Sequence, residues 1–330
     1  MRDGKKKPIE ITSLGALSAY GIERTVIAAG VFDGVHLGHR RLLEAMLRMS
    51  REQQAIPAAF TFFPHPRAVL CPEKAPALLY PPYKKLELLA ACGVEAVITV
   101  PFTRQFAEQS PEAFIRDTLI SNRVRLCGIC VGANWHFGAR GKGSAQHLQQ
   151  FAAAGQFAFE AVTELQRNGI LISSTEIRRA LASGRLDDAA AMLGRPYSLS
   201  GLVGSGHHIA GDRLDCPTAN LMPDDGVLPP CGVYAVRARH HGTIYPAAAN
   251  IGWSPTFEYA DVKKPRVEVH LLDFSGNLYG TKLEIEFMQY LREERSFSSP
   301  EALKTQIRQD IAAIRKMFGE RNLNDWNGQI

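Results

Sequence analysis

The hydrophobic pattern of this chain changes character near residue 200. From residue 25 to about residue 182, short apolar runs alternate with stretches of helical periodicity. Strands that are apolar throughout and separated by helices form a parallel sheet covered on both faces. The pattern therefore predicts an α/β, Rossmann-like N-terminal domain with a parallel sheet. Its expected strands are Val26–Val31, Ala58–Phe62, Ala96–Val100, Leu126–Gly132 and Phe157–Thr163.

After residue 200, apolar and polar residues alternate with a period of two, as in Val267, Val269 and Leu271. This alternation is typical of antiparallel strands with one buried face, and it predicts a small β-barrel followed by a helix over about Pro300–Met317. A length of 330 residues fits two domains. We expect an N-terminal extension (1–24), a first domain (25–182), a linker (183–197) and a barrel domain (198–330).

The segment Gly30–His39, GVFDGVHLGH, lies between the first expected strand and a helical pattern. His36 and His39 then flank a helix N-terminus, where free N–H groups and the helix dipole favour anions. Gly34 and Gly38 let the backbone bend and let a polyphosphate come close. Two imidazoles there would donate to phosphate oxygens as negative charge moves to a leaving pyrophosphate. The segment therefore predicts nucleotidyl transfer.

Two further segments follow expected strands. Thr61–Pro66, TFFPHP, has prolines that fix the backbone after an aromatic pair, so that a ring could stack on a planar heterocycle, unless the Phe belongs to the core. Val131–Gly143, VGANWHFGARGKG, is rich in glycine but lacks the GxxxxGK[ST] spacing of a phosphate loop. In it, Asn134 could hydrogen-bond a ligand, and Trp135 or Phe137 could form a pocket wall.

The segment Ser173–Leu181, SSTEIRRAL, is predicted to open a helix. Ser173 and Glu176 have the spacing of a capping box. The cap does not account for Ser174, Thr175 and Arg178, which together are suited to binding phosphate through charge-assisted hydrogen bonds.

The second half carries two candidate groups. In PTAN, Thr218 and Asn220 offer oxygens suited to Mg²⁺ bound together with substrate phosphates. Glu268, in VEVHLLDF, is a candidate general base if it points into a cavity, and otherwise a solvent-facing glutamate on an alternating strand. The histidine pairs His207–His208 and His240–His241 are given no metal role.

Composition excludes several classes of protein. The net charge is +5 and the basic residues are spread without a nucleic-acid module, which favours a phosphate-rich small molecule over nucleic acid. No apolar run approaches the roughly 20 residues that span a bilayer, and no signal peptide is evident, so we expect a cytoplasmic protein without membrane partners. The six cysteines are expected to be reduced, with Cys127 and Cys130 as core thiols.

Taken together, these strings resemble the prokaryotic bifunctional riboflavin kinase/FMN adenylyltransferase (FAD synthetase) family over nearly the whole chain. The strings that carry the resemblance, in chain order, are GVFDGVHLGH, TFFPHP, the segment Phe106–Ile115, FG..GKG, ISSTEIRRAL, LGRPY, CPTANL, NIGWSPTF, VEVHLLDF and LYG.

The resemblance implies that the N-terminal domain is a nucleotidyltransferase that moves AMP from ATP to FMN, giving FAD and pyrophosphate with Mg²⁺. It implies that His36 and His39 stabilise the ATP phosphates together with Ser174, Thr175 and Arg178. The other implied nucleotide-binding residues are Gly30, Phe32, Asp33, Gly34 and Gly38. The implied flavin-binding residues are Phe62, Pro64, His65, Pro66, Asn134 and Phe137.

For the barrel, the resemblance implies a riboflavin kinase in which Thr218 and Asn220 hold Mg-ATP and Glu268 takes the proton of the ribityl 5′-hydroxyl. The chain departs from the family's G-x-G-R-G-R-x-x-G-[FIY]-P-T-A-N loop, because it has GSGHHIAGDRLDCPTAN. Asp212 stands where an Arg is expected, and an acidic residue there opposes the charge of ATP. Asp215 replaces a Gly, and Ser254 stands where the family usually has Arg.

These departures leave alternatives open. The first is an FMN adenylyltransferase whose kinase-like barrel is inactive or acts on a modified flavin. The second, from another class, is a non-catalytic flavin sensor. In the leading hypothesis the substrates are ATP, FMN and riboflavin. The sequence leaves open whether the chain forms an oligomer.

Overall fold

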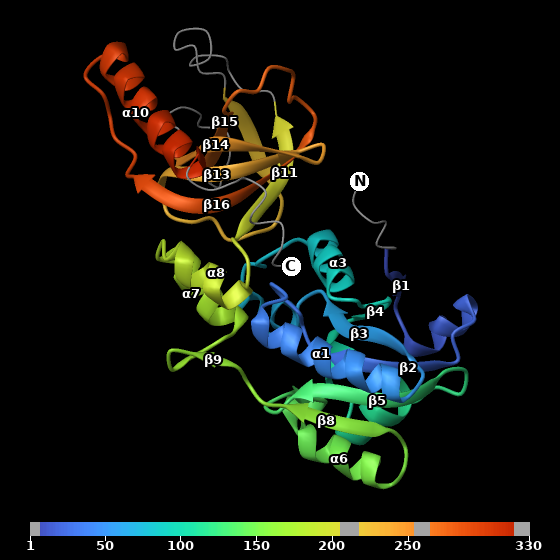
Figure 1. The fold of residues 1–330 in the computed structure, drawn as a ribbon. Coiled ribbons are helices and arrows are strands. Elements are labelled where there is room, and N and C mark those ends of the chain that lie inside the picture. The colour runs from blue at the N-terminus through green and yellow to red at the C-terminus, as the bar shows by residue number, and fades with distance from the viewer. Residues whose placement is uncertain (1–6, 205–217, 254–264, 320–330) are drawn as a thin grey trace. The chain divides into compact units, whose positions relative to one another are not determined.

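The computed structural model describes residues 7–204, 218–253 and 265–319. The chain divides into two compact units, Met1–Ser174 and Thr175–Ile330, shown in Figure 1. They correspond in type to the α/β domain and the barrel that the sequence predicts, and each is described by itself.

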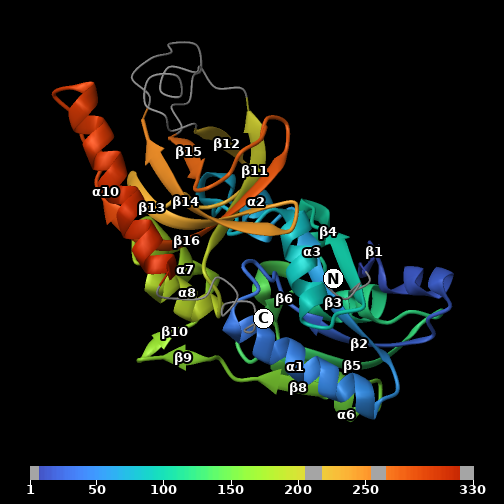
Figure 2. The same ribbon diagram turned by 45° about the horizontal axis from the view of Figure 1, so that its top comes forward.

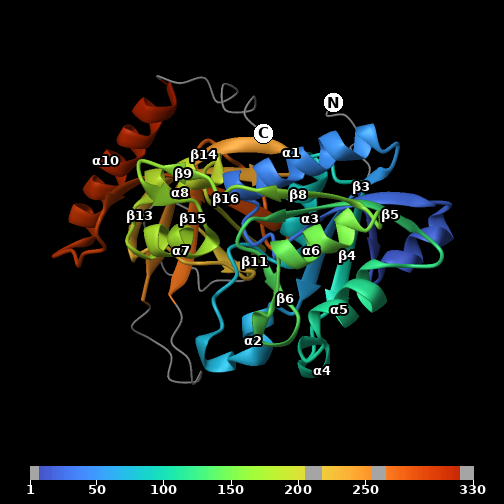
Figure 3. The same ribbon diagram turned by 90° about the horizontal axis from the view of Figure 1, so that it is seen from below.

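The first unit is built on a six-stranded parallel sheet in the order β1-β4-β3-β2-β5-β8. Its central strands carry consecutive buried residues, because both faces are covered. Figure 3 shows the strands lying between α1 (Leu37–Glu52) and α6 (Ala145–Ala153). The strands are β1 (Ile9–Ile11), β2 (Arg24–Ala29), β3 (Ile56–Phe63), β4 (Ala96–Pro101), β5 (Arg125–Gly132) and β8 (Ala158–Val162).

Shorter elements connect these strands and helices. Those relevant to the site are α3 (Pro82–Ala91), which precedes β4, and α2 (Pro66–Leu70), which follows β3. The others are η1 (Leu14–Tyr20), η2 (Pro72–Lys74), α4 (Arg104–Ala107), α5 (Pro111–Ala113), η3 (Phe114–Leu119), β6 (His136–Phe137), η4 (Ala139–Gly141), β7 (Gly143–Ser144), β9 (Gln166–Arg167) and β10 (Ile170–Leu171).

The edge strand β1 was not predicted from the sequence. Ile9–Ile11 pairs in parallel with β4, and Leu14 and Leu17 of the following η1 are buried in the core. Part of segment 1–24, predicted to be an extension, is therefore built into the sheet. A strand of three residues is too short to show a period of its own.

The second unit contains α7 (its first residue, Ser174, closes the first unit), α8, the closed antiparallel barrel β11-β12-β15-β14-β13-β16, and α10. Side chains such as Val267, Val269 and Ile285 fill the barrel, as their period of two predicts. In Figure 2, α10 runs beside β13 and β14. The bounds are α7 (Ser174–Ala182), α8 (Leu186–Leu193), β11 (Ser198–Gly204), β12 (Ala219–Pro223), β13 (Gly232–His240), β14 (Thr243–Gly252), β15 (Arg266–Leu271), β16 (Lys282–Arg292) and α10 (Pro300–Gly319).

Helix α8 lies within the predicted linker, segment 183–197. Within the described ranges, no helix combines the length and the apolar character needed to cross a membrane.

Candidate active sites

The turn between β2 and α1 has an unusual backbone. The N–H of Gly30 donates to the carbonyl of Phe60 at 3.0 Å, which extends the sheet by one residue. Beyond it, Phe32, Gly34 and Val35 have φ values of +54°, +85° and +39°. Left-handed backbone at two buried non-glycine residues is unfavourable and is concentrated at functional sites.

His36 and His39 lie at the N-terminus of α1. His36 is the N-cap residue, and its Nδ1 accepts the backbone N–H of His39 at 3.2 Å. The two imidazoles stack with centroids 3.6 Å apart and planes at 16°. Because Nδ1 of His36 is an acceptor, the neutral ring carries its proton on Nε2. That nitrogen is then a hydrogen-bond donor at a helix end that already favours anions.

The two glycines of the turn have different roles. Gly34 adopts the left-handed conformation that the predicted bend needs. Gly38 was expected to make room for a polyphosphate, but a Cβ there would lie only 3.2 Å from the imidazole of His36. Gly38 thus allows the ring of His36 to fold over the first turn of the helix.

Asp33 connects the turn to two distant segments. Its side-chain Oδ1 accepts the N–H of Leu79 at 2.9 Å, and its carbonyl accepts the hydroxyl of Ser174 at 2.8 Å. Ser174 therefore contacts the turn that precedes the histidines, and its part in binding phosphate stays a prediction. Thr175 and Arg178 follow on α7, in the second unit, and their part in the site stays a prediction.

Lys85, on α3, was missed by sequence reasoning. Its Nζ lies 3.5 Å from the carbonyl oxygen of Val31 and 3.4 Å from Oγ1 of Thr61. Burial lowers the pKa of Lys85, and the nearby Asp33 carboxylate partly opposes this shift. The turn thus has a buried amino group in contact with its main chain at Val31. The only signal in the sequence is a lysine within the apolar helix KKLELLAA.

The two phenylalanine rings of the segment TFFPHP differ in exposure. Phe62 is only 8% exposed and packs edge-on against Phe60 and Phe102, so it belongs to the core. Phe63, which points to the opposite face of the strand, is 50% exposed. His65 is the N-cap residue of α2, and its Nδ1 accepts the N–H of Arg67. Pro64 and Pro66 flank this histidine.

The loop after β5 contains one exposed and one buried candidate. Asn134 is exposed. Its main-chain carbonyl oxygen lies 2.8 Å from Nδ1 of His136. Phe137 is buried and stacks on Trp135 with centroids 4.9 Å apart. A Cβ on Gly143 would lie 2.7 Å from the Phe137 ring, which explains a glycine in this loop. Trp135 and Phe137 thus form one aromatic wall.

A second candidate site lies on the barrel. Glu268 on β15 is paired with Asn220 on β12 and with Asn250 on β14. Residues directly opposite each other in antiparallel strands share a face, so these three polar side chains form one row. Their neighbours Val267 and Val269 are buried in the barrel, so the row lies on its outer face.

A cavity of about 310 Å³ lies between this face and α10. Thr218 and Glu268 line it, so Glu268 meets the condition set for a general base. Asn250 and Glu294 also line it and were not predicted. The full lining is Thr218, Val233, Ala248, Asn250, Glu268, His270, Arg292, Glu294, Arg295, Phe297, Leu303, Ile307, Asp310 and Ile311.

Comparison with known proteins bears on both sites. Residues 20–176 match the FAD synthetase family model, and residues 193–318 match the riboflavin kinase model. The chain is 36% identical over 310 residues to the bifunctional riboflavin kinase/FMN adenylyltransferase of Escherichia coli (strain K12), covering 94% of this chain and 97% of the relative. The chain belongs to this bifunctional family. It carries the two activities of FAD synthesis, riboflavin kinase and FMN adenylyltransferase.

Other relatives agree in sequence and fold. The Pseudomonas fluorescens bifunctional riboflavin kinase/FMN adenylyltransferase is 37% identical over 293 residues, covering 88% of this chain and 92% of the relative. The crystal structure of a Streptococcus pneumoniae protein named macrolide-efflux protein matches with a TM-score of 0.81 and 27% identity, covering 94% of this chain and 99% of that one.

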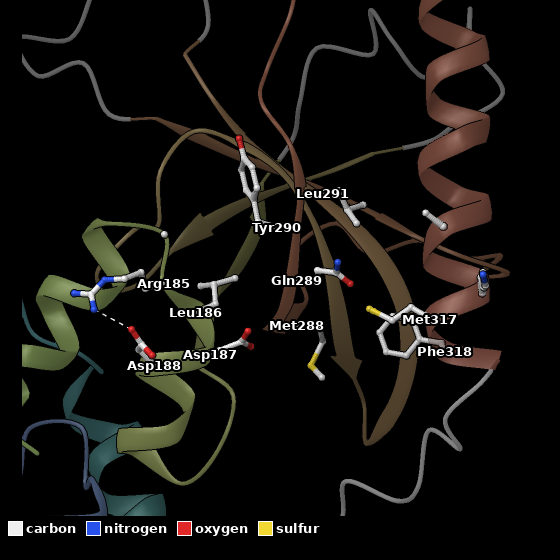
Figure 4. Close-up of a pocket in the computed structure, with 13 residues that line it drawn as sticks. Arg185, Leu186, Asp187, Asp188, Met288, Gln289, Tyr290, Leu291, Met317 and Phe318 are labelled. Atoms are coloured by element: carbon white, nitrogen blue, oxygen red, sulfur yellow. Dashed lines mark hydrogen bonds and ion pairs between the residues drawn. The ribbon is translucent and has the colours of Figure 1, made fainter. Parts of the chain in front are cut away.

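The kinase loop that departs from the family pattern, including His207, Asp212 and Asp215, lies outside the described residues, as does Ser254. Elsewhere in the kinase unit, a groove of about 890 Å³ lies between α8, β16 and the end of α10 (Figure 4). Arg185 and Asp188 at its edge form an ion pair at 2.8 Å. None of the predicted site residues lines this groove.

The described parts of the chain contain no group of three or more His, Cys, Asp or Glu side chains arranged to hold a metal ion. Cys127 and Cys130 are buried in β5. Burial raises the pKa of Cys130 to about 12, so its thiol is protonated at neutral pH, as expected for a core residue.

Proposed function

We propose that His36 and His39 are the catalytic groups of adenylyl transfer. A phosphate oxygen of FMN attacks the α-phosphorus of ATP, the bond from that phosphorus to the bridging oxygen breaks, and pyrophosphate leaves. The observation that carries this role is the Nδ1 contact of His36, because it leaves Nε2–H as a donor at a helix N-terminus. Ser174, Thr175 and Arg178 would bind the same phosphates.

This reaction requires little proton transfer. The FMN phosphate is already anionic at neutral pH, so positioning and charge neutralisation dominate. The amino group of Lys85 contacts the carbonyl of Val31 in the turn and, when protonated, would add to that neutralisation. We place the flavin near the strand exit Phe62–Pro66 and near Asn134 and Phe137, where the exposed ring of Phe63 offers a stacking surface.

We propose that Glu268 is the general base of the kinase reaction. It accepts the proton of the ribityl 5′-hydroxyl while that oxygen bonds to the γ-phosphorus of ATP, and ADP leaves with the bridging oxygen. Thr218 and Asn220 supply a hydroxyl and an amide oxygen, which are hard ligands that fit Mg²⁺. Magnesium bound there with ATP would neutralise charge on the phosphates.

The rival hypothesis is that the barrel binds flavin without phosphorylating riboflavin, or that it acts on a modified flavin. It depends on Asp212 and Asp215, whose carboxylates would oppose the charge of ATP. Chromatographic product analysis distinguishes the two hypotheses, in parallel reactions with ATP-Mg²⁺ and either riboflavin or FMN. We expect FAD from both substrates. FAD from FMN alone would favour the rival.

A further inference from the structure

The cations that line the barrel cavity are already engaged within the chain. Arg292 pairs with Asp310 through two nitrogens, at 3.0 and 2.9 Å. Arg295 donates to Gln306 and lies over the ring of Phe297, 5.0 Å from its centroid. The charge of Arg292 is therefore compensated by a carboxylate, whereas Arg295 is held by a neutral amide and an aromatic ring. Of the acidic side chains on this lining, Glu268 and Glu294 are not held in such pairs.

Glu294 sits in a seat formed by two residues of β14. Nδ2 of Asn250 donates to Oε1 of Glu294 at 3.4 Å. A Cβ on Gly252 would lie 2.1 Å from Oε1 and 2.7 Å from Oε2 of Glu294, which is far inside contact distance. Gly252 has no left-handed φ, so its backbone conformation does not require glycine. The space it leaves is filled by the carboxylate.

The seat lies beside the proposed general base. Asn250 is directly opposite Glu268 across β14 and β15 and donates to Glu294, so it neighbours both glutamates. Two carboxylates repel the phosphates of ATP but accept hydrogen bonds from hydroxyl groups. The rest of the lining includes apolar side chains suited to a planar ring system, among them Phe297, Leu303 and Ile307. The cavity therefore fits a neutral polyol joined to an aromatic ring.

We propose that Glu294, seated by Asn250 and Gly252, is a specificity-determining residue of the kinase reaction whose carboxylate accepts hydrogen bonds from hydroxyl groups of the ribityl chain. This deepens the proposed function, because it rests on the flavin chain reaching Glu268. The contact selects the polyol and holds it so that its terminal hydroxyl lies at the base.

The first test measures binding by flavin fluorescence with two probes, riboflavin and lumiflavin, which has the ring system but no ribityl chain. Glu294→Ala should raise the Kd for riboflavin about tenfold or more, as expected for a hydrogen bond to a charged group. The Kd for lumiflavin and the KM for ATP should change less than about twofold, since such a change is worth only about 0.4 kcal/mol. Glu293→Ala is the matched control, because Glu293 does not line the cavity, and it should leave riboflavin binding unchanged.

Unchanged riboflavin affinity in Glu294→Ala would overturn the proposal. Equal weakening of riboflavin and lumiflavin would also overturn it, because the carboxylate would then act on the ring or only on the shape of the cavity. Rates of FAD formation from FMN, measured on the same variants, report whether the first unit remains intact. The midpoint of thermal unfolding, measured on the same variants, reports whether the barrel remains folded.

A second test uses the seat. Gly252→Ala should displace the carboxylate and weaken riboflavin binding, with no further loss when Glu294 is already alanine. Additive losses in the double variant would contradict a role through Glu294. Glu268→Gln should keep riboflavin binding while turnover is lost. Retained turnover would reject Glu268 as the base, yet the binding tests on Glu294 would still decide the present proposal.

Discussion

The hydroxyl of Ser174 donates a hydrogen bond of 2.8 Å to the main-chain carbonyl of Asp33, 141 residues earlier in the chain. Asp33 lies between Phe32 and Gly34, two residues with left-handed backbone. The bond therefore ties Ser174, which is proposed to bind phosphate, to the strained turn that precedes His36 and His39. Strain of this kind persists only where surrounding contacts hold it.

Ser174→Ala should remove this hydrogen bond and loosen the turn at Asp33. Loss of a hydrogen bond of this type costs about 1 kcal/mol, so we expect FAD formation from FMN to slow by about five- to tenfold. Steady-state kinetics with FMN and ATP measure the effect. Riboflavin phosphorylation in the same preparation serves as the control and should be unchanged. An unaltered rate of FAD formation would mean that Leu79 and the backbone hold the turn without Ser174.

His39→Ala should lower the rate of adenylyl transfer by about 10² or more, by analogy with the loss of one transition-state donor. The backbone N–H of His39, which His36 accepts, remains in the variant, so the cap of α1 is kept. Single-turnover formation of FAD measures the chemical step. Unchanged turnover would remove His39 from the mechanism.

Glu268→Gln should abolish FMN formation from riboflavin, because a neutral amide cannot take the proton of the ribityl hydroxyl. FAD formation from added FMN should persist at the wild-type rate. Chromatography of both reactions gives the answer. Loss of both activities together would indicate misfolding or coupling between the two halves of the chain.

Lys85→Met should change how stability depends on pH. Burial lowers the pKa of Lys85 in the folded chain below its ordinary 10.5, so the unfolded chain binds more protons between those two values. The free energy of unfolding contributed by Lys85 therefore rises with pH through that window. Denaturant unfolding of wild type and Lys85→Met, from neutral pH to about pH 10, measures the difference. A difference that falls with increasing pH would contradict burial as the dominant cause.

Several features of the fold followed directly from local pattern. Continuous apolar runs indicated the central strands of the parallel sheet, because strands buried on both faces carry apolar residues at every position. Alternation with a period of two indicated the barrel, because its strands are buried on one face only. Strand β1 was not predicted, because three residues are too few to show a hydrophobic period. Alternation along β3 does not say which of two adjacent rings faces the core, so the burial of Phe62 and the exposure of Phe63 came only from the structure.

The sequence alone determined the two-part architecture, the placing of His36 and His39 at a helix N-terminus, and the candidacy of Glu268, since each depends on residues close together along the chain. Only the tertiary structure brought Lys85 to the histidine turn, folded the ring of His36 over Gly38, and seated Glu294 against Asn250 and Gly252. These relationships join residues from separate elements. Their distances depend on how strands pair and helices pack, which no local pattern records.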